Sequence, residues 1–272
     1  MHIKNHRLHT DDGNPVPWRP SPNTGGALAP SYLIMHYTAG SSAESSVAHL
    51  TKKSAKASAH LVIARDGSIT QLVPFNRVAW HAGKSRWQGR KGMNGHSIGI
   101  ELDNAGQLTG GPGHWKAWFG RTYDDADVVV AAHRFETEEK GWHRYTEAQL
   151  AAALEVGEAL FDKYGLVDVL GHDDIAPQRK TDPGPAFPMD AFRSRLVGRQ
   201  QDEDDVYLTT SRLNVREGPG VGFDKLPESP LAKGTRLRSD SRDGIWFSVE
   251  VLDEADEAVA TGWVHGDYIV RA

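Results

Sequence analysis

"SYLIMHYTAG", residues 31–40, is a short apolar run that ends at a glycine. A run of this length, bounded by turn-forming residues, is typical of a buried β-strand. The histidine within the run, His36, then lies near the carboxyl end of that strand. The stretch therefore predicts a sheet in the first half of the chain.

Two further stretches predict strands that follow it. Residues 58–74 alternate apolar and polar side chains on both sides of Asp66-Gly67, a dipeptide that suits the tight turn of a β-hairpin. Residues 96–106 alternate in the same way, and their isoleucines predict the buried face of a strand. Glu101 falls on the opposite face of that strand.

The other periodic segments predict helices. Residues 146–165 carry apolar side chains at helical spacing, with Thr146 and Gln149 placed as a capping box and a glycine at the end. Weaker patterns predict helices within residues 41–54 and 188–200.

The order of these elements predicts two domains. Strands and helices intermingle over residues 1–200, which favours an α/β domain with a mixed central sheet flanked by helices. Residues 107–145 lack a regular pattern and predict an irregular insertion with one short strand at 128–132. The tryptophans and the "GGPGHW" stretch of this insertion either stack on sugar rings, close over a peptide or pack beneath the insertion as a small core. An acidic linker at 201–205 then leads to an all-β domain at 206–272.

The composition excludes several classes of protein. The net charge is −5, so there is no overall positive field to hold nucleic acid, although residues 84–92 form a local basic cluster. The chain has no cysteine, which excludes disulfides and thiolate metal ligands. No segment approaches the roughly 18 apolar residues of a membrane span, and the polar start of the chain does not resemble a signal peptide. We expect a soluble chain that binds neither nucleic acid nor membrane.

A metal site in a cysteine-free chain must be built from histidine and carboxylate. His172 closes a further predicted strand, "LVDVLGHDD" (166–174), and Asp182 follows in a loop stiffened by prolines. Together with His36 they can supply the three protein ligands of a hydrolytic zinc site, which keeps a fourth position open for water. In the alternative interpretation, these histidines are ordinary surface or core groups, and Asp182 is a turn former.

Five motifs in the first domain favour the metal site. Their order resembles that of the zinc N-acetylmuramoyl-L-alanine amidases, a family that includes phage amidases and peptidoglycan recognition proteins. The resemblance covers roughly residues 15–198. The motifs are "MHYTAG", "SAHLVIARDGSITQLVP", "AWHAG", "HSIGIEL" and "GHDDIAPQRKTDPGPAF".

The resemblance implies an enzyme that cuts the amide bond between the muramic lactyl group and L-alanine in peptidoglycan or its fragments. It implies one zinc ion (Zn2+) per chain, with three ligands: His36, His172 and Asp182. Glu101 is implied to move the proton of the attacking water, and Lys180 to stabilise the oxyanion. His81 is implied to lie along the substrate groove. From the sequence pattern alone, Glu101 is a solvated carboxylate and Lys180 a surface lysine.

The second domain has a resemblance of its own. "LNVREGPG", a strand carrying Trp246 and "GWVHGDYI" resemble the bacterial SH3-like domains that accompany cell-wall hydrolases. Short alternating strands separated by glycine turns suit a small β-barrel. The resemblance implies a targeting role, in which the domain holds the enzyme near an insoluble polymer. A structural or protein-binding module is the alternative.

Other functions stay open for the first domain. Some relatives bind muropeptides without zinc, so a non-catalytic peptidoglycan-binding protein is the main alternative, disfavoured because every ligand candidate is present. A zinc peptidase that cuts within the stem peptide is another alternative. Without an evident export signal, we expect synthesis in the cytoplasm followed by release to the cell wall, or a cytoplasmic enzyme that recycles anhydro-muropeptides. The sequence does not indicate an oligomeric state.

Overall fold

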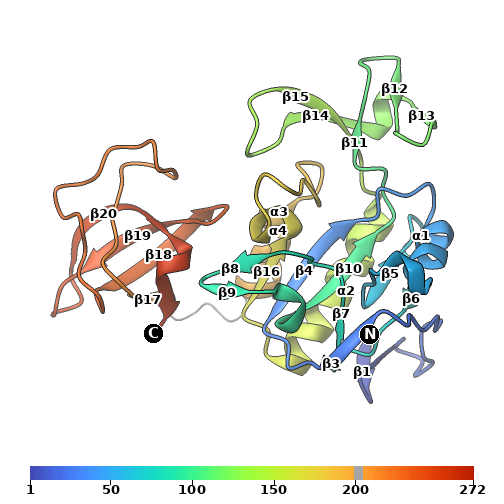
Figure 1. Ribbon diagram of the computed structural model, residues 1–272, viewed down its shortest axis with the longest axis horizontal. Coiled ribbons are helices and arrows are strands. Elements are labelled where there is room, and N and C mark those ends of the chain that lie inside the picture. The colour runs from blue at the N-terminus through green and yellow to red at the C-terminus, as the bar shows by residue number, and fades with distance from the viewer. Residues whose placement is uncertain (199–204) are drawn as a thin grey trace. The chain divides into compact units, whose positions relative to one another are not determined.

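The computed structural model describes residues 1–198 and 205–272 (Figure 1). The chain divides into two compact units, and Arg86–Lys91 group with the second unit although the flanking residues belong to the first. The predicted acidic linker at 201–205 lies outside the described residues except for Asp205, which begins a strand. Among the described helices, none has the length and apolar character that crossing a membrane requires.

A mixed sheet forms the centre of the first unit, as the sequence predicts. Its strand order is β16-β4-β10-β5-β6. The first four strands run parallel to their neighbours, and β6 pairs antiparallel with β5 across the predicted hairpin. The strands are β4 (Tyr32–Tyr37), β5 (Leu61–Ile63), β6 (Ile69–Gln71), β10 (Ser97–Leu102) and β16 (Asp168–Gly171).

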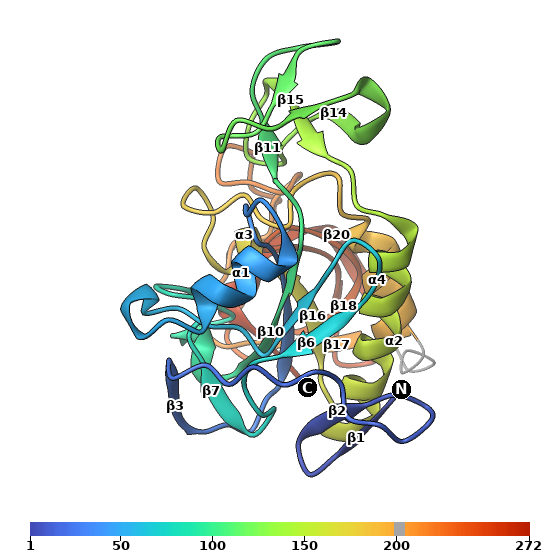
Figure 2. The same ribbon diagram turned by 90° about the vertical axis from the view of Figure 1, so that its right-hand side faces the viewer.

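Helices cover both faces of this sheet (Figure 2). On one face α2 (Glu147–Tyr164) and α4 (Met189–Val197) pack with the alternating apolar residues of the strands into the main core. On the other face α1 (Ala43–Leu50) packs over a smaller apolar cluster that includes Val62 of β5. The short helix α3 (His172–Ile175) directly follows β16. The α/β class predicted from the sequence is therefore confirmed.

Helix α2 has the ends that its sequence predicts. The hydroxyl of Thr146 accepts a hydrogen bond from the backbone N–H of Gln149, and the Gln149 side chain returns to the backbone of Thr146. At the other end Gly165 adopts a left-handed conformation with φ of 59°, which a residue without Cβ reaches at low cost.

The insertion is more ordered than its sequence suggests. The expectation of an irregular segment was wrong except for the strand at 128–132, because very short strands leave no periodic pattern. Strands β11, β15 and β14 form an antiparallel sheet, and β12 pairs with β13. Their bounds are β11 (Gln107–Leu108), β12 (Trp115–Lys116), β13 (Thr122–Tyr123), β14 (Val128–Ala132) and β15 (Glu139–His143). Trp115 and Val128 belong to a local core, which supports the packing interpretation for Trp115. Trp118 is exposed, and the interpretation that the insertion's aromatic residues contact substrate stays a prediction.

Short strands complete the first unit. β1 pairs with β2 and β3 pairs with β7, both antiparallel. They are β1 (His2–Lys4), β2 (Arg7–His9), β3 (Thr24–Ala27) and β7 (Arg77–Ala79).

The second unit is built from β-strands, in agreement with the sequence. Its antiparallel sheet has the order β20-β19-β18-β17-β21. The strands are β17 (Asp205–Thr209), β18 (Arg236–Asp243), β19 (Trp246–Leu252), β20 (Ala258–His265) and β21 (Ile269–Arg271). The hairpin β8 (Arg86–Trp87) and β9 (Arg90–Lys91) is part of this unit, where Trp87 is fully buried. The SH3-like assignment stays a prediction.

Candidate functional site

His36 and Glu101 lie side by side on neighbouring strands. Parallel pairing of β4 with β10 sets Glu101 opposite His36, and the pairing of β10 with β5 extends the row to Val62. Because side chains alternate along a strand, all three point to the sheet face that α1 covers. Backbone hydrogen bonds between adjacent strands thus fix the spacing of the row.

His172 and Asp182 reach the same place from outside the strands. β16 pairs in parallel with β4, so the residue that follows β16, His172, arrives beside the carboxyl end of β4. The chain then returns, and the backbone N–H of Asp173 donates to the carbonyl of Asp182 at 2.9 Å. The hydroxyl of Tyr145 donates to the next carbonyl, that of Pro183, at 2.8 Å.

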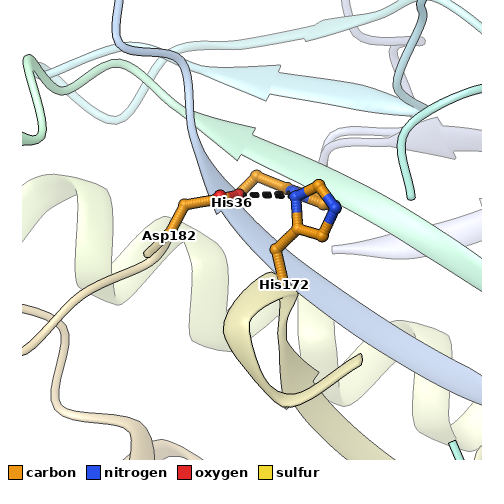
Figure 3. A group of neighbouring side chains, drawn as sticks. All are labelled: His36, His172 and Asp182. Carbon is orange, nitrogen blue, oxygen red and sulfur yellow. Dashed lines mark hydrogen bonds and ion pairs between the residues drawn. The ribbon is translucent and has the colours of Figure 1, made fainter. Parts of the chain in front are cut away.

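Three side chains converge as a result (Figure 3). Oδ2 of Asp182 lies 2.8 Å from Nδ1 of His36 and 2.9 Å from Nδ1 of His172. The two Nδ1 atoms are 3.0 Å apart. All three side chains are buried. Two nitrogens and one oxygen that can each bind a metal thus lie close to a single point.

The electrostatics of the cluster favour a bound cation. Burial, together with the neighbouring His172, lowers the pKa of His36 to about 4, so the imidazole is neutral at pH 7. Burial acts to raise the pKa of Asp182, but hydrogen bonds from His172 and His36 outweigh it and hold that pKa well below its usual range. A neutral imidazole and an ionised carboxylate are the protonation states that a metal ligand needs.

The outer nitrogens of both imidazoles also have partners. Nε2 of His172 is 3.1 Å from the carbonyl oxygen of Ala82, and Nε2 of His36 is 3.0 Å from Nδ1 of His81. Metal-bound histidines commonly use the second nitrogen in this way, which fixes the ring and its tautomer. Two nitrogens and one carboxylate oxygen with such support fit a zinc ion.

His81 lies against the backbone of β10. Its Nε2 is 3.4 Å from both the carbonyl and the hydroxyl oxygen of Ser97, and the ring covers Gly99 so closely that a Cβ there would come within 2.4 Å of it. His81 is 8% exposed, so it contacts His36 more than it contacts solvent. Its expected place along the substrate groove stays a prediction.

Glu101 carries a buried atom that the protein leaves unsatisfied. Its Oε2 has no hydrogen-bond partner among the described residues. Burial, reinforced by the charge of Asp182, raises the pKa of Glu101 well above its ordinary value, and the charge of Lys180 opposes this. A buried carboxylate oxygen without a partner costs stability, and such costs are typical of functional sites.

Lys180 lies near enough to Glu101 and His36 for its charge to act on both. Its side chain is half-buried, and its charge lowers the pKa of both Glu101 and His36. The ammonium is therefore close enough to act on a negative charge that develops beside Glu101. The sequence-predicted residues are thus gathered at one place, and their catalytic roles stay proposals.

The sequence did not predict the side chains that support α3, the helix that begins at His172. Arg134, from the insertion, makes short contact with Asp173 and lies 2.9 Å from Asp174. Nε2 of His133 is 3.0 Å from Asp173. Nothing in a single sequence indicates that a loop arginine 39 residues away pairs with these carboxylates.

The chain is similar in sequence and in structure to known amidases. Residues 26–185 match the N-acetylmuramoyl-L-alanine amidase family. Over 149 residues the chain is 39% identical to 1,6-anhydro-N-acetylmuramyl-L-alanine amidase AmpD of Escherichia coli (strain K12), which covers 54% of this chain and 60% of that protein. Over 183 residues it is 33% identical to N-acetylmuramoyl-L-alanine amidase AmiD of the same organism, covering 64% and 56%.

A solved structure agrees with the sequence comparisons. The crystal structure of a selenomethionine derivative of AmpD matches 72% of this chain and 99% of its own, with 29% identity and a TM-score of 0.51. The chain spans about 60% of the length of the curated relatives it matches.

Proposed function

Because the chain belongs to the N-acetylmuramoyl-L-alanine amidase family, we propose that it is a zinc-dependent hydrolase of peptidoglycan. The bond cut is the amide between the lactyl group of muramic acid and L-alanine of the stem peptide. The observation that carries the proposal is the convergence of His36, His172 and Asp182 beside the unsatisfied carboxylate of Glu101.

The protein groups around the cluster suit this hydrolysis. A zinc ion held by His36, His172 and Asp182 supplies Lewis acidity, which polarises a carbonyl and makes water acidic enough to attack at neutral pH. Glu101 accepts a proton from the attacking water and later delivers it to the leaving amine. The ammonium of Lys180 stabilises the negative charge that the carbonyl oxygen gains in the transition state.

The relatives name two versions of the substrate. AmpD is named for a 1,6-anhydro-N-acetylmuramyl-L-alanine amide, and AmiD for the N-acetylmuramoyl-L-alanine amide. Both names place the scissile bond between muramic acid and L-alanine. We propose that this chain cuts the same bond. Its activity should therefore be assayed on both anhydro-muropeptides and intact peptidoglycan.

The proposal is tested by zinc content and product mass together. Purified protein is analysed for zinc, then incubated with intact peptidoglycan and with an anhydro-muropeptide. We expect near-stoichiometric zinc and free stem peptides that begin with L-alanine. Glu101→Gln should keep the zinc and lose at least 100-fold in kcat, which is within the usual range for a general base.

A matched variant controls for nonspecific effects. Glu138→Gln changes an exposed glutamate of the insertion and should behave as wild type. Cleavage within the stem peptide would replace the amidase by a zinc peptidase. Muropeptide binding without zinc and without cleavage would replace it by a recognition protein.

We propose a targeting role for the second unit, based on its antiparallel sheet and its SH3-like motifs. Such a unit raises the local concentration of the enzyme at an insoluble substrate.

A further inference from the structure

A cavity of about 470 Å³ lies next to Glu101. Its volume is within the ~300–1,000 Å³ range of small-ligand pockets. The segment between β4 and α1, the first turns of α1 and the loop between β12 and β13 line it. The side chains that matter here are Ser41, Ser45, His49, Glu101, Trp118 and Phe119. The insertion thus contributes an aromatic wall to a cavity whose other wall belongs to the core of the first unit.

Trp118 is held in place but left open to solvent. Its Nε1 donates a hydrogen bond of 2.7 Å to the carbonyl of Ala39, and the ring of Phe119 stands edge-on to it at 5.7 Å. The side chain is nevertheless 77% exposed. An indole that is fixed at one edge and exposed over its face can bind a ligand at low entropic cost. The side chain is already ordered before the ligand arrives.

Glu101 is the one acidic group that lines the cavity among the described residues. Serine hydroxyls come from Ser41 and Ser45, whose oxygens lie 3.2 Å apart, and an imidazole comes from His49. The Ser45 hydroxyl also bonds the backbone of Ser42 at the start of α1. Within the described residues, no lysine or arginine lines the cavity. Stem peptides carry free carboxylates, and a cavity wall without lysine or arginine offers them no ion pair. A sugar is neutral, with hydroxyl edges that match serine hydroxyls and a C–H face that packs on an aromatic ring.

We propose that this cavity binds a pyranose residue of the glycan strand, adjacent to the muramic acid whose amide is cut. The inference rests on the proposed amidase function and specifies its substrate class. Trp118 supplies the stacking surface, and the hydroxyl of Ser41 contacts the edge of the sugar ring. The preferred substrate is then a glycan of several sugars and not a single muramic acid with its peptide.

The test compares substrates that differ only in glycan length. The ratio of kcat/KM for a tetrasaccharide–peptide to kcat/KM for a muramoyl-peptide is measured by mass spectrometry. We expect the wild type to favour the tetrasaccharide and Trp118→Ala to lower the ratio about tenfold. Trp118→Phe, which keeps a ring but loses the bond to Ala39, should retain most of the preference. Val130→Ala, at a half-exposed insertion residue outside the cavity, serves as the control.

A second measurement separates this inference from the amidase proposal. Peptide-free tetrasaccharide is titrated into wild type and Trp118→Ala by calorimetry, which needs no catalysis. Binding that weakens at least tenfold in Trp118→Ala supports the subsite even if neither substrate is cut. Equal binding by both proteins, or a length ratio that Trp118→Ala leaves unchanged, overturns it.

Discussion

At the scale of single residues, the close contact between Gly99 and His81 links the geometry of the sheet to His36, one of the proposed metal ligands. The ring of His81 lies where a Cβ of residue 99 would be, and it also contacts His36 at 3.0 Å. Only glycine at this place lets the imidazole lie flat against β10. The position of His36, a proposed ligand, thus depends on the absence of a methyl group at residue 99.

We predict that Gly99→Ala weakens zinc binding by about 10- to 100-fold, the usual effect of disturbing a group that orients a metal ligand. The added methyl displaces His81 and with it His36. Zinc affinity is measured by competition with a chelator. Gly26→Ala adds the same methyl where no atom lies within 4 Å, so it should leave the affinity unchanged. Equal affinities in both variants would contradict the prediction.

His60 predicts a pH dependence of stability. Burial lowers its pKa to about 4, and its Nδ1 accepts a hydrogen bond from Gly99 N–H, which a protonated ring cannot do. Because the folded pKa lies below the unfolded value of about 6.5, the unfolded state takes up more protons between these values. The free energy of unfolding should therefore fall as pH drops from about 6.5 to 4 and stay level above 7.

The variant His60→Gln isolates this effect. Its unfolding free energy should decrease by about 3 kcal/mol less than that of the wild type between pH 7 and pH 4. Urea unfolding at several pH values gives the measurement, with the exposed His114→Gln as control. If the free energy of unfolding changes with pH in the same way for wild type and His60→Gln, His60 does not cause the pH dependence.

At the scale of elements, the insertion supports the helix that carries His172. Arg134 bridges Asp173 and Asp174, both buried in α3, while Asp174 accepts the backbone N–H of Gly171 at 2.6 Å. The pKa of Arg134 is raised above its ordinary value because the attraction of these two carboxylates outweighs its burial. Without the cation, the two buried carboxylates would lose this ion pairing and keep hydrogen-bond partners such as His133 and the backbone of Gly171.

We predict that Arg134→Ala destabilises the first unit by about 1–2 kcal/mol, because two buried carboxylates lose their partner while solvent screens the partly exposed guanidinium. Denaturant unfolding measures the change. Lys140→Ala breaks an exposed i,i+4 pair with Glu136 in the same insertion and should have a much smaller effect. If both substitutions lower the free energy of unfolding by the same amount, the pairing of Arg134 with Asp173 and Asp174 does not stabilise the unit more than an exposed pair does.

The elements differ in how far the sequence determines them. Helix α2 was predictable with its caps because capping depends on residues three positions apart. The meeting of His36 with His172 was predictable in outline, since parallel strands bring their carboxyl ends to one edge. Strand β15 was not predictable, because it contains Gly141, a residue that disfavours strands. Glycine is needed there because the ring of Trp115 would lie 2.5 Å from a Cβ of residue 141, and the sequence does not reveal this contact. The roles of Arg134 and Trp118 depend in the same way on distant partners.

At the scale of the whole molecule, the chain combines a hydrolase fold with a separate β-unit that offers no candidate metal cluster among the described residues. In the second unit, the rings of Trp246 and Tyr268 flank His265 at 5.1 and 5.6 Å. An aromatic group of this kind, with Tyr268 44% exposed, suits contact with a polymer surface.

We predict that the full chain carrying Glu101→Gln sediments with insoluble peptidoglycan. Adding Tyr268→Ala should lower the pelleted fraction several-fold, because the exposed ring is lost. Val259→Ala, at another exposed position of this unit, is the control. A chain that stays in the supernatant would leave the second unit without a targeting role.

The row formed by His36, Glu101 and Val62 has a consequence for how errors in folding would appear. A slip of one residue between β4 and β10 would turn His36 or Glu101 into the apolar core and an isoleucine into the site. Such a slip would thus abolish activity and also disrupt the packing of the apolar core. Partly active molecules with a shifted sheet should therefore not accumulate. A preparation of low specific activity should contain fully active molecules mixed with inactive ones, and titration of zinc-loaded sites would count the active fraction.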